Sequence, residues 1–66
     1  MQDDNDEVFT FGSKMGLPVY KVNSAYLIWA EEEDGLWVKY PELMARVQEE
    51  IRMRDGEGSH FYEDAL

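Results

Sequence analysis

The absence of cysteine limits what this chain of 66 residues can fold into. Domains below about 70–80 residues usually need reinforcement, because one small core then supplies only about 3–5 kcal/mol of stability. No disulfide can provide that reinforcement here. With no thiolate and with His60 as the only histidine, the chain also lacks the ligands of a structural zinc site. We therefore expect a single domain, residues 1–66, that gains stability from self-association or from a partner.

The charge of the chain is strongly negative, with 15 aspartates and glutamates against 6 lysines and arginines and a net charge of -9. Disordered acidic segments combine such charge with few aromatic residues, whereas 14% of these residues are aromatic and 44% are hydrophobic. The composition therefore indicates a folded core with an anionic exterior. Such an exterior repels nucleic acid and anionic membranes and attracts proteins with a basic surface. We expect a basic protein partner, with no direct nucleic-acid binding and no membrane binding.

The N-terminal residues 1–7 are acidic, whereas a secretory signal begins with basic residues and continues with an apolar stretch. The longest apolar run, residues 25–30, is far shorter than the ~20 residues that cross a bilayer. These features predict a cytoplasmic location, with which the lack of cysteine is compatible. Residues 1–7 are expected to form a flexible acidic arm, and residues 57–66 a flexible tail.

Short segments rich in aromatic and β-branched residues predict strands at 8–11, 17–22, 25–31 and 36–40. The last two flank Asp34-Gly35, and Asp-Gly between apolar runs is a strong hairpin signal. The alternative for this region is a helix over residues 24–34 that Gly35 ends. Three glutamates near the C-terminus of such a helix would oppose its dipole, which favours the hairpin.

Residues 41–55 are predicted to form a helix, since Pro41 suits the first helical position and Gly56 suits the position after the last turn. Its apolar stripe consists of Leu43, Met44, Val47 and Ile51. Its expected i,i+4 ion pairs are Glu42 with Arg46 and Glu50 with Arg54. The expected fold class is α+β, with a small antiparallel sheet of three to four strands and this one C-terminal-half helix packed on one face.

Opposed residues of a hairpin share a face, so the predicted hairpin has two apolar faces. The face expected beneath the helix consists of Leu27, Trp29, Val38 and Tyr40. The opposite face consists of Tyr26, Ile28 and Trp37. Either the N-terminal strand or the tail covers this second face, or it forms an interface with a second copy or a partner. Because tyrosine and tryptophan are enriched in interface hot spots, Tyr26 and Trp37 are the candidate anchors.

The loop of the predicted hairpin is acidic, and it has two interpretations. It is either a solvated turn that keeps the hairpin soluble or part of an array of charges that imitates DNA phosphates. Duplex DNA carries one negative charge per ≈ 1.7 Å of axis, so the net charge of -9 corresponds to about five base pairs. The predicted partner-binding residues are Tyr26, Trp37, Glu31, Glu32, Glu33, Asp34, Glu49 and Glu50.

No sequence pattern predicts a catalytic, cofactor-binding or metal-binding residue. The acids at positions 3–7 are consecutive and lack the glycine and the spacing of a calcium-binding EF-hand loop. Acids on a turn and on a helix surface are solvated, whereas catalytic groups usually lie in a cleft that perturbs them. We therefore expect a protein that is not an enzyme and that needs no cofactor or metal.

Residues 25–40, with the sequence AYLIWAEEEDGLWVKY, resemble in pattern the small acidic inhibitors made by phages. These include the dimeric, DNA-mimicking inhibitors of uracil-DNA glycosylase, in which an aromatic-rich, acid-tipped hairpin packs with one helix; anti-CRISPR proteins of similar size and charge fit equally well. The resemblance implies an inhibitor that can form a homodimer and that occupies a basic nucleic-acid-binding surface in the host cytoplasm. The alternatives are a non-catalytic accessory or structural subunit of a larger complex, and an antitoxin or immunity protein.

Overall fold

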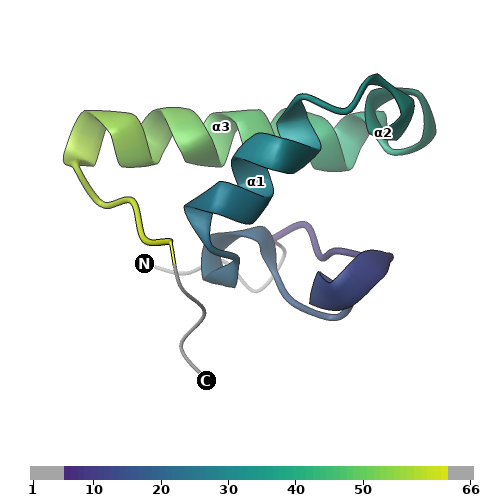
Figure 1. The fold of residues 1–66 in the computed structure, drawn as a ribbon, viewed down its shortest axis with the longest axis horizontal. Coiled ribbons are helices and arrows are strands. Elements are labelled where there is room, and N and C mark those ends of the chain that lie inside the picture. Colours follow the sequence, from purple (N-terminus) through teal and green to yellow (C-terminus); the bar gives the residue numbers. More distant parts are fainter. Residues whose placement is uncertain (1–5, 63–66) are drawn as a thin grey trace.

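The computed structural model describes residues 6–62, and helices account for most of this part of the chain (Figure 1). The longest helix, α3, extends along one side of the molecule, and α1 packs across it. The short helix α2 lies beside the N-terminal half of α3. In chain order, the elements are the 3-10 helices η1 (Gly12–Lys14) and η2 (Val19–Lys21) and the α-helices α1 (Ser24–Glu31), α2 (Asp34–Lys39) and α3 (Pro41–Glu57).

The predicted α+β fold with a sheet of three to four strands is wrong. Residues 6–62 contain no strand, and their only β-type pairing is an isolated antiparallel bridge between Val8 and Pro18. The predicted hairpin is instead the helix pair α1–α2. An Asp-Gly hairpin turn requires a positive φ at glycine, but Gly35 has no positive φ and lies in the first turn of α2.

Helix α1 forms because Asn23 acts as its N-cap. The Asn23 side-chain oxygen accepts a hydrogen bond from the backbone nitrogen of Tyr26 at 2.8 Å, which satisfies one of the free N–H groups of the first turn. The alternative prediction of a helix over residues 24–34 has the right start and the wrong end. The helix stops at Glu31, and Asp34 begins a new helix, where its charge complements the helix dipole instead of opposing it.

Helix α3 confirms the predicted helix that begins at Pro41. It continues to Glu57, two residues further than expected, because Gly58 and not Gly56 takes the left-handed conformation (φ 66°) that ends it. Of the predicted apolar stripe, Leu43, Met44 and Val47 are buried, and Ile51 packs at the edge of the core. The predicted pair of Glu50 and Arg54 forms, whereas the ion-pair partners of Arg46 are Asp6, Glu49 and Glu50 instead of Glu42.

The core lies between α1, α3 and the segment that precedes α1. Its buried side chains are Phe9, Val19, Val22, Leu27, Ala30, Leu43, Met44 and Val47. Aromatic rings extend it at one edge, where Phe11 stacks on Tyr40 with ring centroids 4.6 Å apart. The prediction that Trp29 and Val38 lie beneath the helix is wrong, because these side chains are 48% and 82% exposed.

The two segments predicted as strands at 8–11 and 17–22 form a compact irregular loop that holds η1 and η2. Phe9 N donates to Leu17 O at 3.0 Å and Val19 N donates to Glu7 O at 2.9 Å, so the two ends of this loop lie side by side. Gly12 allows it to turn, since its φ is +71° and a Cβ there would lie 2.7 Å from the Tyr26 hydroxyl oxygen.

The predicted flexible arm and tail lie partly outside the described residues, in 1–5 and 63–66. Within the described part, Asp6 accepts hydrogen bonds from Arg46 Nε and from the backbone nitrogen of Tyr20. After α3 the chain returns to the start of α1, where Ser24 N donates to Phe61 O at 2.6 Å. None of the helices within residues 6–62 has the length and apolar character needed to cross a membrane.

Candidate protein-binding site

Helix α1 is apolar on its outer side as well as on the side that faces the core. Leu27 and Ala30 point into the core, while Ala25, Ile28 and Trp29 follow the i, i+3, i+4 spacing of one helix face and are exposed or half-buried. We call these three residues the α1 stripe. A helix that is apolar all round is normally covered by other protein, so the α1 stripe is a candidate contact surface.

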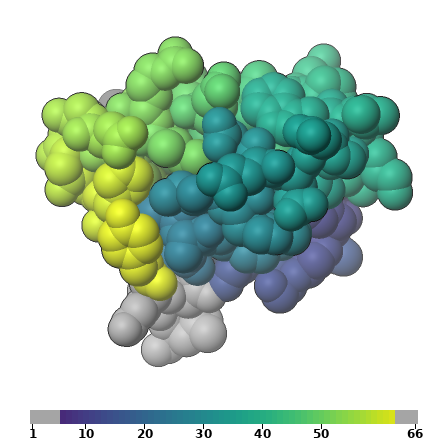
Figure 2. Space-filling view, turned by 45° about the horizontal axis from the view of Figure 1, so that its top comes forward, coloured from purple at the N-terminus to yellow at the C-terminus, as the bar shows by residue number. Residues whose placement is uncertain are grey.

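The α1 stripe ends at a cluster of acids in the connection from α1 to α2. We call Glu31, Glu32, Glu33 and Asp34 the acidic corner. Glu32, Glu33 and Asp34 are exposed, and none of these three acids forms an ion pair with another residue of the described chain. Figure 2 shows α1 and this connection, in blue-green and teal, next to each other on one face. Glu32 N donates to Trp29 O at 3.2 Å, so these acids, which have no ion-pair partner within residues 6–62, begin one helical turn after the exposed Trp29.

The two predicted aromatic anchors, Tyr26 and Trp37, are both half-buried and hold the fold together. The Trp37 indole Nε1 donates to Glu31 O at 2.7 Å, which attaches α2 to the end of α1. The Tyr26 ring packs edge-on against Phe9 at 5.5 Å. These residues do not share an exposed face as the hairpin prediction required. The exposed aromatic residue of this region is Trp29, which the hairpin register had assigned to the core.

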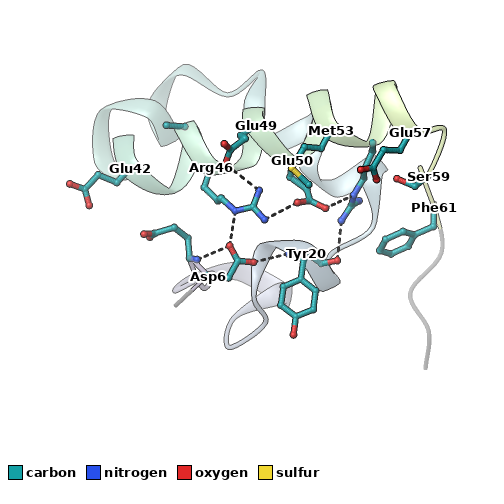
Figure 3. Close-up of a pocket in the computed structure, with 13 residues that line it drawn as sticks. Asp6, Tyr20, Glu42, Arg46, Glu49, Glu50, Met53, Glu57, Ser59 and Phe61 are labelled. Carbon is teal, nitrogen blue, oxygen red and sulfur yellow. Dashed lines mark hydrogen bonds and ion pairs between the residues drawn. The ribbon is translucent and has the colours of Figure 1, made fainter. Parts of the chain in front are cut away.

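The remaining predicted acids, Glu49 and Glu50, are adjacent on α3 but have opposite surroundings. Glu49 is exposed, whereas Glu50 is only 6% exposed and lies in a chain of ion pairs (Figure 3). Glu50 Oε1 lies 2.8 Å from Arg46 Nη2, and Glu50 Oε2 lies 2.9 Å from Arg54 Nε. Asp6 continues the chain through Arg46 Nε at 2.6 Å. The carboxylate of Glu50 therefore neutralises arginines inside the protein.

Arg46 remains charged at neutral pH. Burial by itself lowers the pKa of Arg46, but its hydrogen bonds to Glu50 and Asp6 outweigh that effect and leave the pKa raised. Its Nη1 atom is buried and makes no hydrogen bond within residues 6–62; Glu49 Oε1 lies 3.8 Å from it, beyond hydrogen-bond distance. The guanidinium is thus held mainly through Nε and Nη2.

A wide groove of about 920 Å³ runs beneath α3, with this ion-pair chain at its floor (Figure 3). Glu7, Glu42, Glu49 and Glu57 lie exposed around it. Because Arg46 and Arg54 already compensate Asp6 and Glu50, the other acids of residues 6–62 outnumber the four remaining cations, which are Lys14, Lys21, Lys39 and Arg52. The exposed surface of the described chain therefore keeps an acidic surplus, shared between this groove and the acidic corner.

Ser24, His60 and Asp55 have the side-chain types of a hydrolase triad, but they do not form a site for a substrate. Ser24 Oγ lies 2.8 Å from His60 Nδ1, and His60 Nε2 lies 2.5 Å from Asp55 Oδ1. Ser24 is fully buried, and its oxygen already accepts hydrogen bonds from Arg54 Nη1 and from the backbone nitrogen of Phe61. A nucleophilic oxygen must reach a substrate carbonyl, which this geometry prevents. The cluster instead fastens the chain after α3 to the start of α1.

No group of three or more histidine, cysteine, aspartate or glutamate side chains in residues 6–62 is arranged to hold a metal ion. No protein-family description, curated protein or solved structure matches this chain. The site is therefore defined by its own geometry, in which the α1 stripe adjoins the acidic corner.

Proposed function

We propose that this chain is a small non-catalytic inhibitor that binds a basic surface of another protein and thereby competes with nucleic acid for that surface. The α1 stripe would supply the apolar contact and the acidic corner the electrostatic one. The observation that carries the proposal is the half-exposed Trp29 beside three exposed acids, Glu32, Glu33 and Asp34, that have no ion-pair partner among the described residues.

The two parts of this surface have different roles in the proposal. Tryptophan is among the residues that contribute most to binding when a partner excludes water from it, and Trp29 has such area to lose on association. Charges at the rim of an interface mainly raise the association rate and select the partner. The acidic corner would therefore steer the protein toward a basic surface, and Trp29 would then slow its release.

Competition with nucleic acid follows from the sign and density of the charge. A surface that binds phosphates does so with lysine and arginine side chains, and the same side chains attract carboxylates. The exposed acids of the corner and of the groove rim, which include Glu42, Glu49 and Glu57, offer carboxylates on two parts of the described surface. A protein that binds DNA or RNA through a basic cleft is thus the class of partner that this charge distribution favours.

The test begins with capture from the native host on the immobilised chain, comparing the unmodified protein with Trp29→Ser and Val38→Ser. Both variants remove an exposed apolar side chain, but only the first belongs to the α1 stripe. We expect the partner to be lost with Trp29→Ser and retained with Val38→Ser. The captured protein is then titrated with duplex DNA or RNA in the presence of this chain.

Mutually exclusive binding of the chain and the nucleic acid supports inhibition by occupancy. A ternary complex with nucleic acid contradicts it, and the chain would then be an accessory subunit. Equal loss of the partner with both serine variants would contradict the assignment of the α1 stripe.

A further inference from the structure

Among the residues that the structure describes, the extended segment around Val8 is hydrogen-bonded along one edge only. On the paired edge, Phe9 N donates to Leu17 O and Gly16 N donates to Phe9 O, at 3.0 and 2.8 Å. In an antiparallel pair, successive residues direct their backbone groups to alternate sides. The backbone groups of Val8 therefore face the other way, and neither Val8 nor Thr10 makes a backbone hydrogen bond on that side with another of residues 6–62. Both residues are exposed, so this edge is open to a ligand.

A cavity of about 260 Å³ lies beside this open edge. Val8 and Thr10 form one side of it, and residues 39–43, at the junction of α2 and α3, form the other. Tyr40, Pro41 and Leu43 are the apolar residues of this second side, and Lys39 and Glu42 place one charge of each sign beside them. The arrangement thus combines free backbone donors and acceptors with a space that fits one apolar side chain, as sites that accept an added β-strand do.

We propose that this edge binds an extended, basic segment of a partner protein as an added β-strand. The backbone of the segment would pair with Val8 and Thr10, and one of its apolar side chains would enter the cavity. Its flanking lysines or arginines would lie near Glu7, which precedes Val8, and near Glu42, which lines the cavity; both acids are exposed, and they outnumber Lys39, the one cation in the cavity lining. The added strand would supply the pairing that a lone edge lacks.

Charge decides between a partner segment and a second copy of this chain. A second copy paired at the same edge would bring its Glu7 close to the Glu7 of the first copy. It would also bring together two chains that each carry a net charge of -9. Like charges at such distances oppose pairing, whereas a basic segment neutralises them. The proposed edge contains no residue of the α1 stripe or the acidic corner, so a test of strand binding at this edge is independent of a test of the proposed function.

The test uses the 15N-labelled full chain and a synthetic peptide, acetyl-KVKVKVK-amide, whose alternating pattern suits an extended strand with one apolar face. We expect addition of the peptide to shift the amide resonances of Val8 and Thr10 and to slow their hydrogen exchange at least tenfold. A peptide N-methylated at alternate residues loses its hydrogen-bonding edge and should bind about tenfold more weakly, the effect of losing one or two net hydrogen bonds.

Two variants of the protein complete the experiment. Val8→Pro removes the outward N–H, a change that an edge tolerates, and should weaken the peptide about tenfold; Val8→Thr keeps the N–H and the β-branched shape and should bind as the unmodified protein does. If Val8→Pro does not fold, the N-methylated peptide decides alone. Equal affinity of the methylated and unmethylated peptides would overturn the proposal, because binding would then be electrostatic. Concentration-dependent protection of Val8 and Thr10 without peptide would also overturn it, in favour of a second copy.

Discussion

The indole nitrogen of Trp37 donates a hydrogen bond of 2.7 Å to the backbone carbonyl oxygen of Glu31. Glu31 is the last residue of α1, and carbonyls at that position have no partner within their own helix. One side chain of α2 therefore satisfies the end of α1 and sets the direction in which the chain leaves it. The other three acids of the acidic corner, Glu32, Glu33 and Asp34, lie between these two residues in the chain, so this bond also holds the backbone that carries them.

Replacing Trp37 with phenylalanine should therefore destabilise the protein. The aromatic packing is largely kept, but the half-buried carbonyl of Glu31 loses its donor, at a cost of about 1–2 kcal/mol in the free energy of unfolding. Urea denaturation followed by circular dichroism measures the change. Trp29→Phe is the matched control and should stay within about 0.5 kcal/mol, because Trp29 is at the surface. Equal effects of the two substitutions would refute the capping role of Trp37.

Glu50 and Glu49 provide a pair of adjacent glutamates that should respond very differently to substitution by glutamine. Glu50→Gln removes the charge between Arg46 and Arg54, the latter only 3% exposed, and should cost about 3 kcal/mol. Such a loss is most of the stability expected for a core of this size. Glu49→Gln should change stability by less than about 0.5 kcal/mol. Thermal unfolding curves that coincide for the two variants would show that the ion-pair chain is not stabilising.

Two glycines should respond in opposite directions to alanine. Gly12→Ala forces a left-handed backbone on alanine and brings its Cβ to 2.7 Å from the Tyr26 hydroxyl oxygen, so we expect a loss of about 1–2 kcal/mol or more. Gly56 lies within α3 and has open space where a Cβ would be, so Gly56→Ala should raise the free energy of unfolding by about 0.5–1 kcal/mol. Adding Tyr26→Phe to Gly12→Ala should recover only the part of the loss that the clash causes. Chemical denaturation of these three variants and of the unmodified protein checks these values.

The proposed steering by the acidic corner predicts a kinetic effect. Changing both Glu32 and Glu33 to glutamine should lower the association rate with the captured partner several-fold at low salt and leave the dissociation rate nearly unchanged. Added salt should slow the unmodified protein and reduce the difference, because it screens exposed charges. Glu49→Gln with Glu57→Gln changes the net charge equally and is the control. If this control slows association just as much, overall charge and not the corner is responsible.

The helix α3 could be predicted from the sequence because its signals are local and agree with one another. Pro41 starts it, the apolar positions from Leu43 to Ile51 repeat with helical spacing, and Glu50 and Arg54 are one turn apart. Two details of this helix were predicted wrongly, the terminating glycine and the ion pair between Glu42 and Arg46. Gly56 and Gly58 are equivalent in sequence terms, and the structure shows that the helix continues through the first to the second.

The region of residues 24–40 was predicted wrongly because its local signals conflict. Tyr-Leu-Ile-Trp favours strand by propensity, yet Asn23 caps a helix there, and packing of Leu27 and Ala30 against α3 holds it. The same error exchanged the roles of the tryptophans. The spacing of Ala25, Ile28 and Trp29 would have revealed the α1 stripe if the segment had been interpreted as helical.

The ion-pair chain beneath α3 could not be predicted, because one of its members is distant in sequence. The i,i+4 rule finds Glu50 with Arg54, and it also suggested Glu42 for Arg46. The structure brings Asp6 to Arg46 across 40 positions of the chain. Asp6 belonged to a segment that looked like a solvated arm, and no periodic pattern links it to α3.

Because Asp6 binds Arg46, the stability of the middle of α3 depends on a residue near the N-terminal end of the described chain. Proteolytic trimming between Asp6 and Glu7 would remove the carboxylate bound to Arg46 and to the backbone of Tyr20. Among the other described residues, Glu50 would then be the one carboxylate within hydrogen-bond distance of Arg46 and Arg54, since Glu49 lies 3.8 Å from Arg46. A purification tag that displaces Asp6 would have the same effect, so recombinant forms that differ only at the N-terminus should differ in melting temperature.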